Sequence, residues 1–128
     1  MIIATGIDLI EIERIKRAMN HSPRFLERIL TRKEKEALKR KGMKPSSAAA
    51  YFVAKEAVSK VLGTGIGKIS WQEIECLNDD NGAPYIVLHG NALIAADMRR
   101  IDQILISISH DQHTALAYAL GQRTNQKG

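Results

Sequence analysis

Residues 52–67 read FVAKEAVSKVLGTGIG, an apolar run that is interrupted by Lys55, Glu56 and Lys60 and leads into three glycines. With the alanines that precede it, this run predicts a helix over about residues 47–62 that ends in the glycine loop. We expect it to be the most buried helix of the protein, with the other elements packed around it. The apolar register of this helix is Ala49, Phe52, Val53 and Ala57.

The residues before this helix predict one strand and three helices. A short run of apolar, β-branched residues indicates the strand, and a Thr-x-x-Glu capping box opens the third helix. The connector at residues 44–47 supplies an N-cap for the long helix. The strand spans residues 2–9 and ends near Asp8, and the helices begin at Glu11, Pro23 and Thr31, the last of them stopping at Gly42.

The residues after the glycine loop predict two hairpins and one helix. Alternation of apolar and polar residues indicates the strands, and a turn-rich Asn/Asp/Gly segment separates the first two. Helices that come early and antiparallel strands that come late argue for an α+β fold, an antiparallel sheet packed around the long central helix. We expect a single domain over residues 1–121 and a polar tail over 122–128. The strands are 69–77, 85–88, 103–110 and 114–120, and the helix is 91–100, with Leu93, Ile94 and Met98 inward.

The composition of the chain restricts its class. With 128 residues, 45% of them hydrophobic and 26% charged, it is expected to be an ordinary soluble globular protein without a membrane span. The first charges follow the apolar residues of the N-terminus, the wrong order for a secretory signal. Cys76 is the only cysteine, which excludes an intrachain disulfide and suits a reducing cytoplasm. We interpret Cys76 as a small buried hydrophobe.

Positive charge is concentrated in one part of the chain. Residues 14–44 contain 12 basic and 3 acidic side chains. Such a block favours an anionic partner, which is a nucleic acid, an anionic membrane surface or an acidic protein. The alternative is a solvated helix face. Only Phe25 in the block offers an aromatic ring for stacking on bases, and no nucleic-acid-binding motif is present, so a nucleic-acid partner is disfavoured.

Two carboxylates and a lysine are the first candidates for chemistry. Glu56 and Lys60 lie at i and i+4 of the long helix, where they form either an exposed salt bridge or the wall of a cleft. Asp8 stands alone between apolar residues, either as the N-cap of the next helix or as a site group. Asp8 and Glu56 together offer two hard oxygen ligands, which suits Mg²⁺ bridged to substrate phosphates.

The glycine loop and a histidine are weaker candidates. Gly63, Gly65 and Gly67 allow backbone N–H groups to approach an anion, although the loop follows a helix, and a helix stop explains it equally well. Ser107-Ile-Ser-His110-Asp comes at the end of a predicted strand. His110 is either an exposed hairpin residue or a donor to a phosphate.

Several of these segments together resemble one family. GIDLIEIERI, FVAKEAVSK with GTGIG, NGAPYI and SISHD follow one another in order and at matching spacing over roughly residues 2–120. The set is similar to the short bacterial 4′-phosphopantetheinyl transferases of the holo-[acyl-carrier-protein] synthase type. The resemblance implies the fold of that family and transfer of phosphopantetheine from coenzyme A to a serine of an acyl carrier protein. It also implies homotrimers with each active site at a subunit boundary.

The resemblance also implies roles for residues. Asp8 and Glu56 would hold Mg²⁺, and Lys60 would neutralise phosphate charge or assist proton transfer. Glu56 would accept the serine proton, either directly or through a metal-bound water. The other expected contacts are Gly63 and Gly65 with the pyrophosphate, Pro84 and His110 with the adenosine 3′-phosphate part, and Arg14, Arg24 and Arg28 with the acidic carrier protein.

One position departs from the family pattern. Where the family usually has an arginine before the aromatic residue of the AKEA run, this chain has Tyr51. A contact to a phosphate of coenzyme A is therefore missing or comes from another basic residue. Two other classes remain as alternatives, a small nucleic-acid-binding module and a non-catalytic oligomeric scaffold. The scaffold predicts no dependence on metal or coenzyme A.

Overall fold

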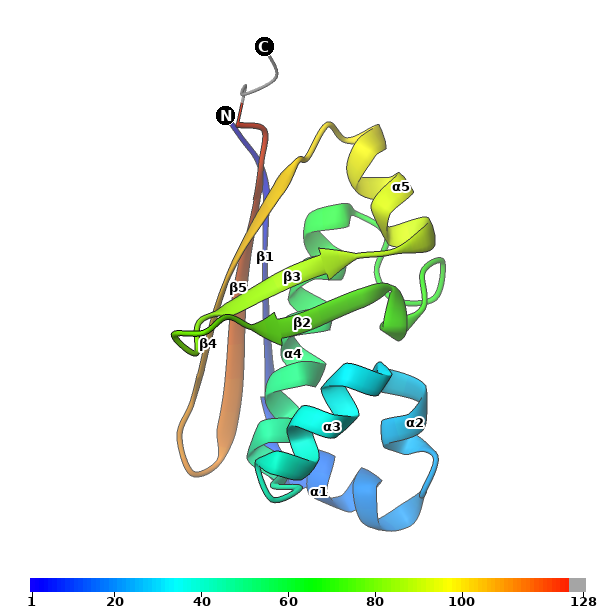
Figure 1. The fold of residues 1–128 in the computed structure, drawn as a ribbon, viewed down its shortest axis with the longest axis vertical. Coiled ribbons are helices and arrows are strands. Elements are labelled where there is room, and N and C mark those ends of the chain that lie inside the picture. The colour runs from blue at the N-terminus through cyan, green and yellow to red at the C-terminus, as the bar shows by residue number, and fades with distance from the viewer. Residues whose placement is uncertain (125–128) are drawn as a thin grey trace.

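The computed structural model describes residues 1–124 of the chain, and residues 125–128 of the predicted polar tail lie outside the described residues. Most helices come early in the chain and most strands come late, the α+β order that the sequence predicts, shown in Figure 1. The elements are β1 (Ile2–Glu11), α1 (Ile12–His21), α2 (Phe25–Ile29), α3 (Arg32–Arg40), α4 (Pro45–Leu62), the 3₁₀ helix η1 (Trp71–Glu73), β2 (Ile74–Asn78), β3 (Pro84–Leu88), α5 (Gly90–Met98), β4 (Gln103–His110) and β5 (Thr114–Gln122).

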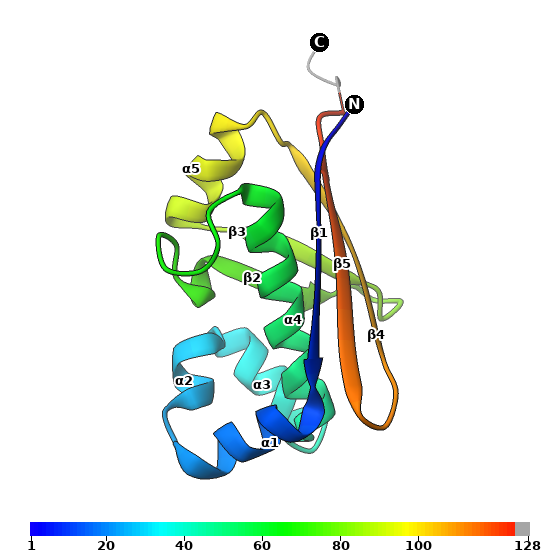
Figure 2. The same cartoon turned by 180° about the vertical axis from the view of Figure 1, so that it is seen from behind.

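The strands form two antiparallel sheets. One contains three strands in the order β1-β5-β4, and the other is the hairpin β2-β3. Figures 1 and 2 show α4 running beside the three-stranded sheet, with α1, α2 and α3 gathered at one end of the molecule and α5 at the other. The predicted arrangement of antiparallel strands around a long central helix is confirmed, with the strands divided between two sheets.

Small residues let α4 lie close to the sheet. Along β5, Ala115, Ala117 and Ala119 alternate onto the buried face, because successive side chains of a strand point to opposite sides. The facing part of α4 also carries small or β-branched residues that are fully buried, among them Ala57 and Val61. This close packing makes α4 the most buried helix, as its apolar sequence predicts.

Several element boundaries differ from those predicted. The helix predicted to begin at Pro23 begins at Phe25, with Arg24 as its N-cap. The strand predicted from residue 69 begins only at Ile74, because Ser70 and Glu73 form a capping box that holds residues 71–73 in a helical turn. Helix α4 begins at Pro45, a residue that suits the first helical position because its missing N–H needs no partner there. β1 continues past Asp8 to Glu11, since its pairing with β5 is unbroken there.

The predicted inward face of the last helix is wrong. Leu93, Ile94 and Met98 are exposed, and Met98 retains 80% of its accessible surface. α5 instead buries Ala92 and Ala96, so the helix contacts the core through its small side chains. Apolar spacing alone identified the helix but not the face that the core would use.

Other expectations about the chain have mixed outcomes. Cys76 is buried, and burial raises the pKa of its thiol to about 12, which confirms its interpretation as a small hydrophobe. None of the helices in the described part of the chain is long and apolar enough to cross a bilayer. β5 extends to Gln122, and Thr124 N–H donates to Asp102, while the domain boundary at 121 remains a prediction.

Candidate active site

Asp8, Glu56 and Lys60 come together where β1 lies against α4. Asp8 is on the face of β1 that points toward the helix, and its side chain is 20% exposed. The Lys60 ammonium donates to the Ile7 carbonyl at 2.7 Å and lies 3.5 Å from Asp8 Oδ1. The structure therefore unites two segments that are about fifty residues apart in the chain.

A glycine in β1 makes this approach geometrically possible. A Cβ atom placed on Gly6 would lie 2.2 Å from the carbonyl oxygen of Ala57, a distance that no side chain tolerates. Since Gly6 and Asp8 are on the same face of the strand, the close contact at Gly6 carries Asp8 toward Glu56. Sequence reasoning placed Gly6 inside a strand but missed this role, and an isolated strand glycine was the available signal.

The two carboxylates of the cluster, Asp8 and Glu56, repel each other. Burial raises the pKa of Glu56, the negative charge of Asp8 raises it further, and Lys60 opposes both effects. The simple alternative, an exposed salt bridge between Glu56 and Lys60, is not what forms, because Lys60 reaches across to β1. The other alternative, Asp8 as a helix cap, is also wrong, since Glu11 occupies the N-cap of α1.

The two carboxylates fit a hard cation that is shared with substrate. Within residues 1–124, no group of three or more His, Cys, Asp or Glu side chains could hold a metal by itself. A pair of oxygen donors is typical of Mg²⁺ sites in which substrate phosphates and water complete the coordination. A cation bound between Asp8 and Glu56 would reduce the repulsion between their negative charges.

The glycine loop caps α4. Gly63 adopts the left-handed conformation, with φ of 77°, and its N–H donates to the Lys60 carbonyl. The N–H groups of Thr64 and Gly65 both donate to the carbonyl of Ser59. These N–H groups are therefore already hydrogen-bonded to the end of α4. The loop still leaves free space beside its backbone, because a Cβ atom on Gly65 would meet nothing within 4 Å.

A basic residue that the sequence did not single out joins this loop. Arg99, which follows α5, donates from Nη1 to the Val61 carbonyl at 2.6 Å. A Cβ atom on Gly63 would lie 2.8 Å from the same guanidinium nitrogen. Arg99 thus places positive charge at the C-terminal end of α4, where the helix dipole favours it.

Pro84 and His110 line one cavity, although 26 residues separate them in the sequence. The cavity has a volume of about 410 Å³ and lies between the first turns of α4, the β2-β3 hairpin and the end of β4. Tyr51 and Lys41 also line it. Sequence reasoning singled out Tyr51 as a departure from the family pattern but did not identify Lys41, which was one of many residues in the basic block.

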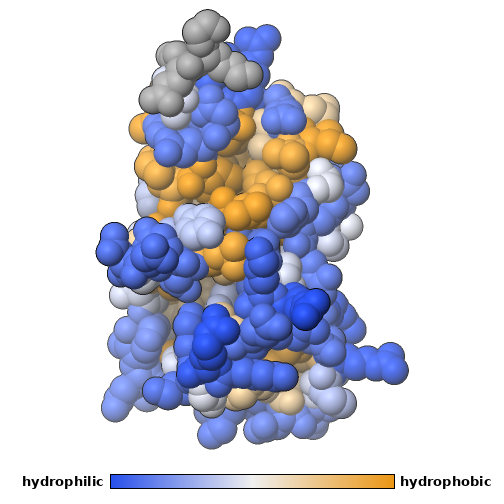
Figure 3. Space-filling model, viewed as in Figure 1, coloured by the Kyte–Doolittle hydropathy of each residue, from blue (hydrophilic) through white to orange (hydrophobic). Residues whose placement is uncertain are grey.

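The predicted partner residues are on α1 and around α2. Arg14 is in α1, Arg24 precedes α2 and Arg28 is within it. All three are exposed, and within residues 1–124 none of them forms an ion pair. Figure 3 shows this end of the molecule covered by hydrophilic side chains, whereas apolar side chains gather toward the end that carries α5.

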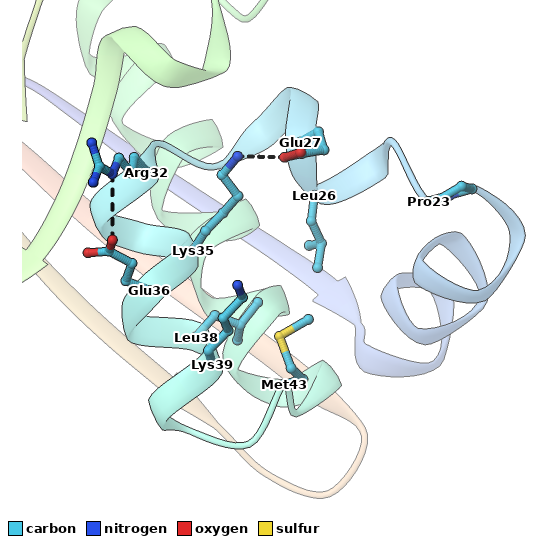
Figure 4. Close-up of a pocket in the computed structure, with 9 residues that line it drawn as sticks. All are labelled: Pro23, Leu26, Glu27, Arg32, Lys35, Glu36, Leu38, Lys39 and Met43. Atoms are coloured by element: carbon cyan, nitrogen blue, oxygen red, sulfur yellow. Dashed lines mark hydrogen bonds and ion pairs between the residues drawn. The ribbon is translucent and has the colours of Figure 1, made fainter.

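A separate groove between α2 and α3 contains none of the predicted site residues. It has a volume of about 440 Å³, and Figure 4 shows Leu26, Leu38 and Met43 among its lining residues. Four of its charged side chains are paired locally, Lys35 with Glu27 and Arg32 with Glu36. Two basic residues of the block, Arg32 and Lys35, are thereby neutralised within the molecule.

Comparison with known proteins identifies the family of the chain. A model of the 4′-phosphopantetheinyl transferase superfamily matches residues 4–119, a range that includes Asp8, α4 and most of the last hairpin. The chain belongs to this superfamily. It is 52% identical to the holo-[acyl-carrier-protein] synthase of Alkaliphilus metalliredigens over 94% of this chain and 98% of the relative.

Solved structures of the superfamily share the fold. The holo-(acyl-carrier-protein) synthase of Bacillus anthracis, in complex with CoA (3′,5′-ADP), is 35% identical with a TM-score of 0.81, covering 97% of this chain and 99% of that one. The Helicobacter pylori synthase, in complex with coenzyme A, is 35% identical with a TM-score of 0.81 over 93% and 100% of the two chains. The family and the fold that the sequence motifs implied are both confirmed.

Proposed function

We propose that the protein is a holo-[acyl-carrier-protein] synthase that acts in the cytoplasm and supports fatty acid biosynthesis. It transfers 4′-phosphopantetheine from coenzyme A to a serine of apo-acyl carrier protein and releases adenosine 3′,5′-bisphosphate. The observation that carries this proposal is the meeting of Asp8, Glu56 and Lys60 in a chain of this superfamily. The coenzyme A complexes of the related synthases support the choice of donor substrate.

The chemistry of the cluster suits a displacement at phosphorus. The serine hydroxyl attacks the phosphorus that carries pantetheine, the bond to the departing nucleotide phosphate breaks, and the serine proton passes to Glu56. The raised pKa of Glu56 favours its acceptance of a proton. Lys60, fixed by the Ile7 carbonyl and Asp8, presents positive charge toward the phosphates.

Asp8 and Glu56 would hold Mg²⁺ in the working enzyme. When bound, the ion supplies charge neutralisation to the pyrophosphate and to the leaving phosphate. In the same proposal, Gly63 and Gly65 line the pyrophosphate beside the end of α4. The open space around Gly65 supports this placement.

We propose a homotrimer with sites at its subunit boundaries, and two observations support this proposal. The sheet face turned away from α4 exposes Ile7 (54%) and Leu9 (64%) of β1, together with Leu105 of β4 and Tyr118 of β5. An apolar patch of this kind marks an interaction surface. Tyr51 and Glu56 are five residues apart on α4, which turns them about 140° around the helix axis. Tyr51 marks the cavity that Pro84 and His110 line, and Glu56 marks the carboxylate cluster. Because the two face different directions on one chain, a single coenzyme A that contacts both kinds of site is accommodated better between two subunits.

Sedimentation equilibrium tests the trimer. The purified protein is expected to have three times the 14.2 kDa mass of the chain. Tyr118→Lys and Leu9→Lys in the exposed sheet face should reduce that mass to that of a monomer and abolish transfer. A monomeric wild-type protein that is fully active would exclude the interfacial site.

The acidic carrier protein is expected to dock on Arg14, Arg24 and Arg28. Arg24→Glu should raise the KM for carrier protein about tenfold or more, because opposite charges steer and hold the complex. The KM for coenzyme A should stay within about twofold. Steady-state kinetics with each substrate varied in turn measures both values, and Arg32→Glu, a reversal at an arginine already paired with Glu36, is the matched control. Equal changes in both KM values would remove Arg24 from the partner surface.

A mass-shift assay tests the function itself. Purified protein, Mg²⁺, coenzyme A and apo-acyl carrier protein are incubated together, and the carrier protein is examined by mass spectrometry. We expect it to gain the mass of one phosphopantetheine group, and we expect EDTA to prevent that gain. A folded trimer that leaves the carrier protein unmodified would refute the proposed function.

A further inference from the structure

The segment that follows α5 is fixed to the sheet and lies beside the end of α4. Figures 1 and 2 both show α5 next to the C-terminal end of α4. Ile101 is 4% exposed and packs against Gly121 of β5, where a Cβ atom would lie 3.1 Å from Ile101 Cδ1. The N–H of Asp102 donates to the carbonyl of Gln122. The backbone that carries Arg99 is therefore anchored to β5 within the next three residues.

Arg99 holds the last turn of α4 from this anchored position. Its Nη1 atom donates to the Val61 carbonyl at 2.6 Å. The same guanidinium lies against Gly63, because a Cβ atom there would be 2.8 Å from Nη1 and 3.3 Å from Cζ. Since a guanidinium is planar and rigid, this one side chain restrains both the helix end and the first residue of the glycine loop.

The restrained turn carries two parts of the candidate site. Lys60, whose ammonium lies 3.5 Å from Asp8 Oδ1, directly precedes Val61. Gly63 and Gly65 follow Val61 in the loop that is proposed to line the pyrophosphate. A shift of this helix end would therefore displace the lysine and the loop together.

The charge of Arg99 is available at this position. Within residues 1–124, no carboxylate forms an ion pair with Arg99. The side chain is exposed, and its hydrogen bond to Val61 uses one of the five N–H groups of a guanidinium. Arg99 can therefore hold the α4 carbonyl and still contribute positive charge beside the loop.

We propose that Arg99 is a positioning residue for coenzyme A, because it holds the end of α4 so that Lys60 and the glycine loop meet the pyrophosphate together. The proposal rests on the proposed function, which places the pyrophosphate at this end of the helix. It adds a residue from a segment that contains none of the predicted site residues. Arg99 acts through the backbone of α4, so the effect does not require Arg99 to contact the substrate.

Kinetics of variants at position 99 test this role. Arg99→Met keeps an unbranched side chain and removes its donors. We expect the KM for coenzyme A to rise about tenfold, as for a lost hydrogen bond to a charged group, and the KM for carrier protein to stay within about twofold. Arg99→Lys keeps a cationic donor and should recover most of the loss. The matched control is Arg100→Met, which removes the same charge at the next exposed residue and should change neither KM.

A double variant tests whether Arg99 acts through the loop. In Gly63→Ala, the added Cβ atom pushes the guanidinium aside, and the alanine must also adopt a φ of 77°. Both single changes therefore disrupt the same contact. Combining Gly63→Ala with Arg99→Met should raise the KM for coenzyme A by less than the product of the two single effects. Effects that simply multiply would overturn the positioning role.

Amide hydrogen exchange measures the loop without any substrate. The N–H groups of Gly63, Thr64 and Gly65 donate to carbonyls of the last turn of α4. In Arg99→Met, these N–H groups should exchange about tenfold faster, because the helix end opens locally more often. The N–H groups of β5 should exchange at the wild-type rate, which distinguishes local opening from a general loss of stability.

The outcomes separate this proposal from the proposed function. Arg99→Met must show both faster exchange in the loop and a raised KM for coenzyme A alone. Either change without the other, equal changes in both KM values, or the same changes in Arg100→Met would overturn the role of Arg99, even if the protein modifies its carrier protein normally. Absence of transfer by the wild-type protein would refute the proposed function, and isothermal titration with coenzyme A would then replace the KM in deciding the role of Arg99.

Discussion

Replacing Glu56 by glutamine is expected to reduce phosphopantetheine transfer by about 1,000-fold or more without destabilising the fold. The loss follows because one change removes a carboxylate ligand of the proposed cation and the proposed acceptor of the serine proton. Asp8→Asn should lower the rate to a similar degree, since only Asp8 and Glu56 supply oxygen ligands in this cluster. Rates are measured by mass spectrometry of the carrier protein.

The stability of the Glu56→Gln variant should be equal to or greater than that of the wild-type protein. The fold raises the pKa of Glu56 above its ordinary value of 4.5, first through burial and then through the charge of Asp8. The folded state therefore binds more protons than the unfolded state above pH 4.5, and wild-type stability falls as the pH rises through the raised pKa. Glutamine removes this loss, so the difference in stability should grow from pH 4.5 toward neutral pH.

Urea unfolding in buffer with EDTA measures this effect, because the chelator removes any bound cation that would stabilise the wild-type site. Glu36→Gln, at an exposed glutamate of α3, is the matched control and should change neither rate nor pH dependence. A Glu56→Gln variant that retains more than about a tenth of the wild-type rate would exclude Glu56 as an essential ligand.

Replacing Lys55 by methionine should lower the free energy of unfolding by about 3–5 kcal/mol, the usual cost of removing one partner from a buried ion pair. Lys55 and Glu34 are both fully buried, and Lys55 Nζ lies 2.8 Å from Glu34 Oε1. The same ammonium donates to the carbonyls of Trp71 and Ile74. The variant would leave a buried carboxylate and two carbonyls without this donor.

The network of Lys55 joins elements that are distant in the chain. Glu34 belongs to the capping box of α3 and also accepts a hydrogen bond from the N–H of Cys76, at the centre of β2. Lys55 therefore connects α4 to α3, η1 and β2 at one point. Because Glu56 follows it directly, the network also fixes the part of α4 that carries the candidate site.

Denaturant unfolding tests the role of Lys55. Lys39→Met, at an exposed lysine of α3, should change the free energy of unfolding by less than about 0.5 kcal/mol. The double variant Lys55→Met with Glu34→Leu should cost less than the sum of the two single changes, because the two side chains satisfy each other. Additive costs would mean that the ion pair contributes little.

Most of the fold could be predicted from local patterns. Apolar spacing identified the helices, the capping box at Thr31 was correct, and alternation identified both strands of the last hairpin. The errors occurred where another local motif or a tertiary contact determined the structure. The Ser70–Glu73 capping box replaced the start of a strand, and α5 packed through Ala92 and Ala96 instead of its larger apolar side chains.

The candidate site could be predicted only in part. Asp8, Glu56 and Lys60 were identified by motif, and the structure brings them together. Gly6, Arg99 and Lys41 were missed, because the role of each depends on a neighbour that is far away in the sequence. A glycine in a strand or a lysine in a basic block has no local signature of such a contact.

By itself, the sequence determined the helices and strands, the family and the residues at the centre of the candidate site, because periodicity, capping and motif spacing are local properties. Only the tertiary structure decided which charges are partners. The sequence of the helix does not distinguish the partners of its two lysines. In the structure, Lys55 is buried against Glu34, whereas Lys60 reaches the strand that carries Asp8. The physical reason is direction: successive helix residues point about 100° apart, so the packing around α4 determines the partner of each.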